Sequence, residues 1–242
     1  MRAAAPLGGG IIAAGEGSRL RADGFLMPKP LVPVAGVALI ERALHNLLSV
    51  GVRTPVIIVN EQARACVDWL YERFPGVDFE FVVKTTRSSL ESFLEVSRRL
   101  PPGRSVISTV DAWCPPEAFK QFVDAALKRP HEASVLAVTP LVADDNPLWV
   151  DVDDDGLIRG MGGTSGTLVT AGIYMLSARA HATVPPPLAR LRDFLTWLVH
   201  EGEPVYAEAI PAVVDVDRAS DVALAERLQT VYNNQRCEGG EP

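Results

Sequence analysis

Short apolar runs alternate with amphipathic segments along the first part of the chain. The runs that predict buried strands cover residues 10–14, 56–59, 79–83, 106–110 and 133–139. Between them apolar side chains recur with helical spacing, which predicts helices over residues 37–50, 61–74, 88–100 and 116–128. Strands that alternate with helices in this way favour a mostly parallel sheet covered on both faces.

The second part of the chain has a different pattern. Two short apolar stretches flank Asp153-Asp154-Asp155-Gly156, which predicts a hairpin turn. The aspartates also suggest a calcium-binding loop, but Gly162 stands where such a loop needs glutamate. Further elements are expected at residues 148–160, 169–175, 188–200, 205–216 and 220–232, followed by a loose polar tail over residues 233–242. No repeat or clear linker divides the chain. We therefore expect one α/β domain over residues 1–242 with a doubly wound, mostly parallel but mixed sheet.

Composition limits the function classes. The 242 residues are 48% hydrophobic and 22% charged, which is typical of a soluble globular protein. The net charge of −7 argues against a nucleic-acid partner, and no apolar run is long enough to suggest a membrane partner. Three scattered cysteines and an N-terminus without a signal-peptide pattern indicate a cytoplasmic protein.

The segment from Gly15 to Pro33 carries the candidate chemistry. It reads G-E-G-S-R-L and, after a short gap, P-K-P-L-V-P, directly behind the strand expected at residues 10–14. A glycine-rich turn at the carboxyl end of a parallel strand offers backbone N–H groups to phosphates. Arg19 and Lys29 add positive charge, so the segment predicts a polyphosphate site.

Two better-known phosphate loops do not fit this segment. Leu20 replaces the third glycine of the dinucleotide fingerprint, and Glu16 replaces the lysine of the Walker loop. The segment instead resembles the signature of the sugar-phosphate nucleotidyltransferases, roughly L-A-A-G-x-G-[ST]-R-L followed by P-K-P-L-[VL]-P-[VI]. This chain has I-A-A-G-E-G-S-R-L at residues 12–20 and P-K-P-L-V-P-V at residues 28–34.

The resemblance implies a Rossmann-like nucleotidyltransferase domain. Its donor signature loop would span residues 8–36, and its acceptor side about residues 140–232. Arg19 would contact the leaving pyrophosphate and Lys29 the phosphates at the reaction centre, as the catalytic residues. The residues implied to bind the nucleotide are Ala13, Ala14, Gly15, Gly17, Ser18, Ser88 and Ser89. The two serines also fit a plain helix cap.

Mg²⁺ is the implied cofactor, because nucleotidyl transfer needs a cation to offset charge on the triphosphate. Asp111 ends the strand at residues 106–110 and resembles the first metal ligand of the family, although Val110 replaces the usual glycine. Near the C-terminus, Asp215 and Asp217 share one face of an extended segment and resemble the second ligand position. Either or both could bind metal, with Asp215 slightly favoured.

The acceptor is less clearly specified. A-G-I-Y at residues 171–174 resembles the family's acceptor strand and makes Gly172 an acceptor-binding candidate. The lysine that often holds a sugar phosphate is absent before this strand, which leaves Arg159 as the candidate for that role. The departure keeps phosphocholine or a phosphonate open as acceptors.

These observations predict an enzyme that transfers NMP from an NTP to a small phosphorylated acceptor and releases pyrophosphate. A sugar 1-phosphate is the expected acceptor, within sugar-nucleotide biosynthesis. One alternative is a cytidylyltransferase acting on phosphocholine or a phosphonate. Another is a catalytically weak nucleotide-binding protein on the same scaffold. We expect a monomer or a small homo-oligomer.

Overall fold

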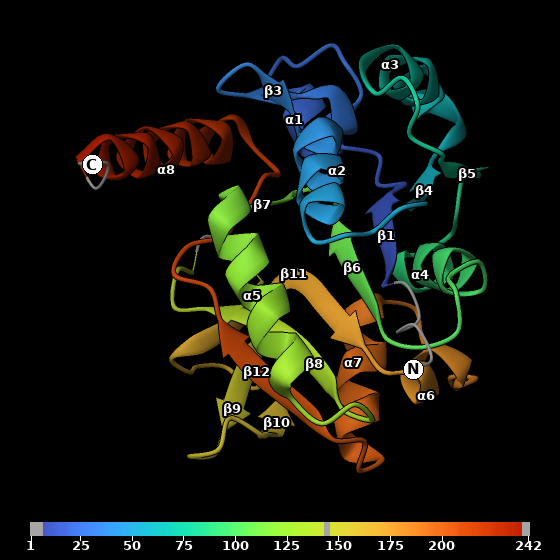
Figure 1. The fold of residues 1–242 in the computed structure, drawn as a ribbon, viewed down its shortest axis with the longest axis vertical. Helices are drawn as coiled ribbons and strands as arrows, with labels where there is room; N and C mark the ends of the chain where they lie inside the picture. Colours follow the sequence, from blue (N-terminus) through green and yellow to red (C-terminus); the bar gives the residue numbers. More distant parts are fainter. Residues whose placement is uncertain (1–6, 143–145, 239–242) are drawn as a thin grey trace, which may run out of the picture.

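The computed structural model of the protein describes residues 7–142 and 146–238. A nine-stranded mixed sheet forms its centre, with helices packed on both faces (Figure 1). The strands are β1 (Gly8–Ala13), β4 (Val56–Val59), β5 (Glu80–Val83), β6 (Ser105–Thr109), β8 (Ser134–Thr139), β9 (Trp149–Val152), β10 (Ile158–Met161), β11 (Leu168–Leu176) and β12 (Val205–Ala209). Their order is β10-β9-β11-β6-β1-β4-β5, with β8 beside β11 and β12 beside β8.

Parallel pairing dominates one half of the sheet and antiparallel pairing the other. β1 lies between β4 and β6, and all three run parallel, as does β5 at the edge. β11 runs antiparallel to β6, β8 and β9, whereas β8 and β12 are parallel to each other. The predicted α/β class with a mixed, mostly parallel sheet is therefore confirmed.

The helices divide between the two faces of the sheet. They are α1 (Ser18–Ala22), α2 (Leu39–Ser49), α3 (Ala65–Arg73), α4 (Ser89–Ser97), α5 (Pro116–Lys128), α6 (Ala178–Ala182), α7 (Leu191–His200) and α8 (Ala219–Glu238). Neighbouring residues of β1 show the division: Ile11 belongs to the core formed with α2, α3 and α5, and Ile12 to the core formed with α4, α6 and α7. Strands buried on both faces explain the continuous apolar runs in the sequence.

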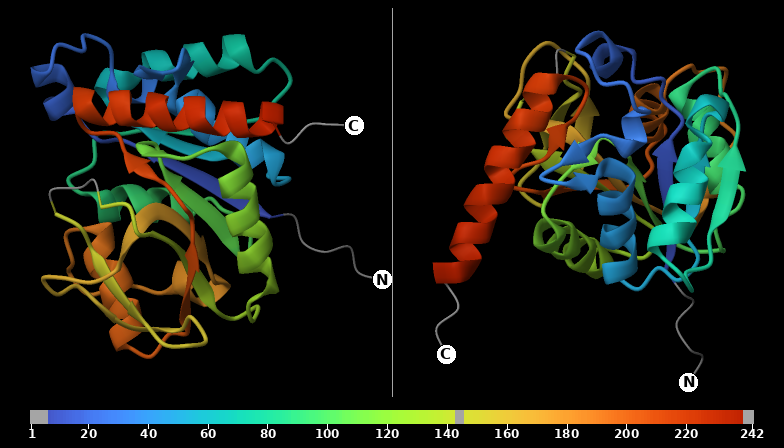
Figure 2. Two further views of the ribbon diagram at one scale, coloured as in Figure 1. Left: turned by 90° about the vertical axis from the view of Figure 1, so that its left-hand side faces the viewer. Right: turned by 90° about the horizontal axis from the view of Figure 1, so that it is seen from above.

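The element boundaries differ from the predictions most clearly in two places. Residues 61–74 were expected to form one helix, but Glu61–Ala63 is a 3-10 turn, η2, that precedes α3. The loose tail expected from residue 233 is wrong as far as Glu238, because α8 continues to that residue and no glycine or proline interrupts it. Residues 239–242 lie outside the described part. Figure 2 shows α8 running along the outside of the molecule.

Two short ladders shape the carboxyl edge of the parallel strands. β2 (Pro33–Val34) pairs with β3 (Val37–Ala38), and β7 (Ala112–Trp113) pairs with β13 (Val214–Asp215). The second ladder brings the segment before α8 next to the end of β6. None of the helices in the described part of the chain combines the length and the apolar character needed to span a membrane.

Candidate active site

The signature loop begins where β1 ends at Ala13. Gly17 precedes α1 with a φ of 63°, in the left-handed region. A Cβ atom on Gly17 would lie 2.6 Å from the Cβ of Lys29, so glycine is what allows the loop and the P-K-P segment to approach so closely. Ser18 then begins α1, and the space beside Gly15 is open for 4 Å around the position of a Cβ. The backbone at Gly15 is therefore accessible, whereas Ala13 and Ala14 are buried.

Asn60, the first residue after β4, holds this loop in place. Its Nδ2 donates hydrogen bonds to the carbonyl oxygens of Ala14 (3.3 Å) and Gly15 (3.2 Å), and its Oδ1 accepts one from the N–H of Ala63 (2.8 Å). Sequence reasoning missed this residue. The available signal was a polar side chain directly after an apolar strand, at the edge where parallel strands place their ligands.

Lys29 lies between two carboxylates. It begins the 3-10 turn η1 (Lys29–Leu31), and its side chain is only 5% exposed. Its Nζ is 2.6 Å from Oδ2 of Asp111 and also donates a hydrogen bond to Oδ1 of Asp217. Nη1 of Arg19 donates to the other oxygen of Asp217 at 2.9 Å. Both cations predicted for the donor phosphates are thus paired with residues predicted to bind metal.

The opposite charges in this cluster stabilise each other's ionised forms. Burial lowers the pKa of Lys29, but the charges of Asp111, Asp217 and Asp215 outweigh burial and hold that pKa above its ordinary value. Burial likewise raises the pKa of Asp111, and the Lys29 ammonium more than reverses this, so that the pKa lies below its usual range. Lys29 and Asp111 are therefore an ammonium and a carboxylate at neutral pH.

Three carboxylates form the candidate metal site. One oxygen from each of Asp111, Asp215 and Asp217 lies within 4.8 Å of the others. The β7–β13 ladder causes this proximity, since it sets Asp215 opposite Ala112. A set of carboxylate oxygens is what Mg²⁺ prefers, so these residues fit a divalent cation. Asp221 lies outside this set and caps α8, because its Oδ2 accepts hydrogen bonds from the N–H groups of Asp217 and Arg218.

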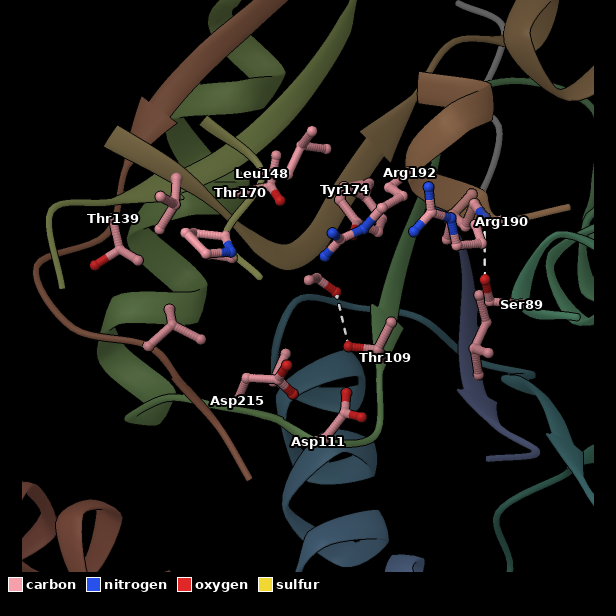
Figure 3. Close-up of a pocket in the computed structure, with 18 of the residues that line it drawn as sticks. Ser89, Thr109, Asp111, Thr139, Leu148, Thr170, Tyr174, Arg190, Arg192 and Asp215 are labelled. Atoms are coloured by element: carbon pink, nitrogen blue, oxygen red, sulfur yellow. Dashed lines mark hydrogen bonds between the residues drawn. The ribbon is translucent and has the colours of Figure 1, made fainter. Parts of the chain in front are cut away.

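A cavity of about 220 Å³ opens beside these carboxylates (Figure 3). β11 and the first residues of α4 and α7 contribute to its walls. Apolar wall residues are Ile12, Ala112, Leu141, Pro147, Leu148, Val169, Ala171, Leu191 and Val213; hydroxyl groups come from Ser89, Thr109, Thr139, Thr170 and Tyr174; charged residues are Asp111, Asp215, Arg190 and Arg192. This cavity is our candidate acceptor site.

The two arginines of the cavity were not predicted from the sequence. Arg190 precedes α7 and pairs with Asp193 at 2.9 Å, and Arg192 donates to the carbonyl oxygen of Asn146 at 2.9 Å. Figure 3 shows both near Tyr174, on the side of the cavity away from Asp111 and Asp215. Burial and the nearby Asp111 raise the pKa of Tyr174, which keeps its hydroxyl protonated. This side of the cavity is thus suited to an anion.

Gly172 shapes the floor of the cavity. Its φ of 69° is left-handed, and the pairing of β11 with β8 changes register between Thr170 and Tyr174. A Cβ atom at this position would lie 2.6 Å from Oγ1 of Thr109 and 2.9 Å from Cβ of Ala112. The structure therefore brings the A-G-I-Y segment into the cavity through a bulge that requires glycine.

The remaining predicted site residues lie in different places. Ser88 caps α4, accepting a hydrogen bond from the N–H of Glu91 at 3.1 Å, whereas Ser89 reaches the cavity and accepts from the N–H of Leu191 at 3.0 Å. Arg159 lies on the β9–β10 hairpin, pairs with Asp153 at 2.7 Å and is not among the residues that line the cavity.

Val110, which replaces the glycine usual in the family, does not fill the site. Val110 is buried in the core, its N–H donates to the carbonyl oxygen of Ile12 at 3.0 Å, and its side chain does not line the cavity.

This combination of fold, phosphate-type loop and acidic cluster defines a nucleotidyltransferase domain. The chain belongs to the family of MobA-like NTP transferase domains, whose family model matches residues 9–166. The predicted family resemblance and the prediction of a nucleotidyltransferase are confirmed at this level.

Similar curated proteins carry names of the same class. The chain is 30% identical over 192 residues to a 2-aminoethylphosphonate cytidylyltransferase from Lancefieldella rimae, covering 76% of this chain and 70% of that protein. It is 28% identical over 180 residues to a CMP-5'-(3-aminopropyl)phosphonate synthase from Streptomyces rubellomurinus, covering 72% and 28%. It is also 28% identical to a bifunctional IPC transferase and DIPP synthase from Rubrobacter xylanophilus, covering 92% and 52%. The chain thus spans about half or less of the latter two.

Solved structures share the fold. The inositol-1-phosphate CTP transferase from T. maritima superposes with a TM-score of 0.77 at 18% identity, over 91% of this chain and 95% of that one. A putative glucose-1-phosphate thymidylyltransferase from Bacillus anthracis gives a TM-score of 0.79 at 16% identity, over 92% and 94%. The Rossmann-like nucleotidyltransferase fold is thereby confirmed.

Proposed function

We propose that the protein transfers CMP from CTP to a small phosphonate or phosphomonoester acceptor and releases pyrophosphate. The observation that carries this proposal is the cavity in which Arg190 and Arg192 lie across from the carboxylates of Asp111 and Asp215. Guanidinium groups are well suited to hold a phosphonate or phosphate through paired hydrogen bonds. The anion held there would face the donor phosphates near Lys29.

The choice of cytidine is supported by the similar proteins. The two phosphonate-related relatives are named for CMP or for cytidylyl transfer, and one of the structural neighbours is named a CTP transferase. The donor loop would bind phosphates through its backbone N–H groups, and such contacts are common to all nucleotides.

A short alkyl acceptor is better supported than the sugar 1-phosphate expected from the resemblance. Nine of the described residues that line the cavity are apolar, and Arg159, the residue expected to hold a sugar phosphate, is paired with Asp153 outside the cavity. An alkyl chain gains from apolar walls, whereas a sugar needs a hydrogen-bond partner for each hydroxyl that it buries. Both phosphonates named in the relatives are short aminoalkyl compounds.

The reaction is an in-line displacement at the α-phosphorus of CTP. An oxygen of the acceptor forms a bond to the α-phosphorus while the bond to the β-phosphate oxygen breaks, and pyrophosphate leaves with that electron pair. The second pKa of a phosphomonoester is about 6, so its attacking oxygen is already ionised at neutral pH and needs no general base. Arg190 and Arg192 would orient the acceptor, and Tyr174 would donate a hydrogen bond to it.

The donor side would neutralise the charge that moves toward pyrophosphate. Lys29 would bind the α-phosphate and Arg19 the departing phosphates. Asp111, Asp215 and Asp217 would hold a divalent cation such as Mg²⁺, which would supply further neutralisation of the triphosphate.

The test is pyrophosphate release from a matrix of donors and acceptors. CTP, UTP, ATP, GTP and dTTP are each combined with 2-aminoethylphosphonate, 3-aminopropylphosphonate, phosphocholine, inositol 1-phosphate and glucose 1-phosphate, with Mg²⁺ present. We expect the highest kcat/KM for CTP with an aminoalkylphosphonate, and no release by the Asp111→Asn variant. Release with glucose 1-phosphate alone would overturn the proposed acceptor. Tight CTP binding without release for any pair would instead favour a nucleotide-binding protein.

A further inference from the structure

We propose that Lys29 is the resident cation of the carboxylate cluster in the free protein. A divalent cation and the nucleoside triphosphate then bind together, by exchanging the ion pairs that Lys29 and Arg19 already make. This inference concerns the regulation of the proposed donor site, and it rests on that proposed function.

The contacts around Lys29 place a positive charge where the metal would sit. Its Nζ contacts both Asp111 and Asp217, and these are two of the three residues whose oxygens cluster within 4.8 Å. Arg19 takes the remaining oxygen of Asp217 at 2.9 Å. Two of the three carboxylates and both cations are therefore engaged in internal pairs, which a metal ion or a triphosphate must break to use these side chains.

Burial makes the exchange costly for either ligand alone. A metal ion arriving by itself would have to displace the Lys29 ammonium, whose side chain is 5% exposed, and would leave that charge without a partner. A triphosphate arriving by itself would draw Lys29 and Arg19 away and leave Asp111 and Asp217 uncompensated. When both arrive, the metal takes the carboxylates and the phosphates take the cations, so every charge is paired again. The structure thus predicts strong positive coupling between metal and nucleotide.

The first test measures metal binding by the protein alone. Mn²⁺ is titrated into the full chain, and free Mn²⁺ is followed by its EPR signal. Lys29→Met removes the charge but keeps a long apolar side chain. We expect this variant to bind Mn²⁺ at least about tenfold more tightly than the wild type, because one competing charge has left the ligands. An unchanged affinity in a folded Lys29→Met variant would overturn the proposal.

Two further variants assign the effect to the cluster. Arg21→Met removes the same charge from an exposed position of α1 and should leave Mn²⁺ affinity within about twofold, because exposed charges are screened. Asp111→Asn combined with Lys29→Met should lose the tight site. A tight site that survives in this double variant would mean that the metal binds elsewhere, which also contradicts the proposal.

The second test works from the nucleotide side and does not depend on folding of a Lys29 variant. CTP binding is measured by calorimetry in EDTA. Asp217→Asn breaks the pairs with both cations and should strengthen metal-free CTP binding by at least about tenfold. Asp215→Asn removes the same charge from the same cluster but leaves these two pairs in place, and it should have a clearly smaller effect. Equal effects of the two variants would show that only the net charge matters and would overturn the proposal.

The outcomes separate this inference from the proposed reaction. If wild-type protein turns over CTP but Lys29→Met shows no gain in Mn²⁺ affinity, the inference fails and the reaction stands. If the gain in Mn²⁺ affinity is seen while no acceptor is turned over, the proposed reaction fails and the ion-pair exchange stands.

Discussion

The donor and acceptor sides of the site are built in opposite ways. Donor groups come from one continuous segment, residues 13–29, and are already tied to the carboxylates by ion pairs. The acceptor cavity collects residues from several separate stretches, from Ile12 to Asp215, and its arginines pair with Asp193 and with the carbonyl oxygen of Asn146. A phosphate loop can be specified by a short motif, whereas a cavity wall depends on distant strands and helices meeting in space.

This difference indicates how the two sides should respond to change. The donor side is one charge network, so loss of a member affects its partners strongly. The acceptor side is a set of more independent contacts, so its substitutions should act mainly on acceptor binding.

The largest effect is expected at Lys29. Lys29→Ala should lower kcat by roughly 10³-fold, as loss of a group that stabilises transition-state charge does elsewhere. The measurement is steady-state pyrophosphate release, with circular dichroism to confirm folding. Lys84→Ala is the matched control, because Lys84 pairs with Glu91 and Glu95 outside the site and its removal should leave kcat unchanged. Near-wild-type turnover by Lys29→Ala would refute the assigned role.

The two cavity arginines should affect the acceptor selectively. Arg192→Ala should raise the KM for the acceptor by roughly tenfold or more and change the KM for CTP little, because a charge-assisted contact is lost on one side only. Arg190→Ala should act in the same direction. Arg159→Ala is the decisive control: the sequence predicted Arg159 as the phosphate ligand, but its pairing with Asp153 predicts unchanged kinetics. Parallel increases in both KM values for Arg192→Ala would show that the two sides are not independent.

Substitution of Gly172 by alanine should lower the unfolding free energy more than the same substitution at a left-handed glycine elsewhere. Gly172→Ala combines backbone strain with a clash against Thr109 and Ala112, and should cost about 3 kcal/mol of unfolding free energy. Gly163 has a φ of 84° and nothing within 4 Å of a Cβ, so Gly163→Ala should cost only about 1 kcal/mol. Urea unfolding of both variants tests the difference, and equal losses would mean that the close approach at Gly172 is unimportant.

The smallest effect is expected at Ser89, which lines the acceptor cavity and contacts the start of α7. Ser89→Ala removes the acceptor of the hydrogen bond from the N–H of Leu191 and should cost about 1 kcal/mol of unfolding free energy. Because that bond fixes the start of α7 beside Arg190 and Arg192, we expect a two- to fivefold rise in the KM of the acceptor, about 1 kcal/mol at most. Ser88→Ala provides the comparison: it removes a helix cap outside the cavity and should lower stability without this rise.

Most of the fold could be predicted because its signals are local. Apolar runs at residues 10–14 and 56–59 mark strands buried on both faces, as Ile11 and Ile12 show by facing different cores. The direction of β11 could not be predicted, since a strand has the same apolar pattern whether its neighbour is parallel or antiparallel. The ladder of β7 with β13 was also missed, because strands of two residues carry no periodicity.

The residues of the candidate site likewise fall into those that the sequence indicates and those that only the structure reveals. Arg19 and Lys29 could be named from the donor motif, Asp111 from a strand end, and Asp217 from the resemblance of its segment to the family's second ligand position; the structure brings them together. Arg190 and Arg192 could not be named, because an arginine at the start of an amphipathic helix is ordinary until the cavity beside it is known. Asn60 was missed because its role is to hold the backbone of another segment, and the sequence does not record such contacts.

The place of the carboxylates along the chain has a consequence for synthesis. Asp215 and Asp217 follow β12, so they leave the ribosome after every strand of the main sheet has been made. Domains begin to fold while they are synthesised, and the sheet can therefore pair before these residues arrive. A nascent chain would hold only the Lys29–Asp111 half of the cluster. Catalytic competence would be acquired only when the segment that carries Asp215 docks onto β7.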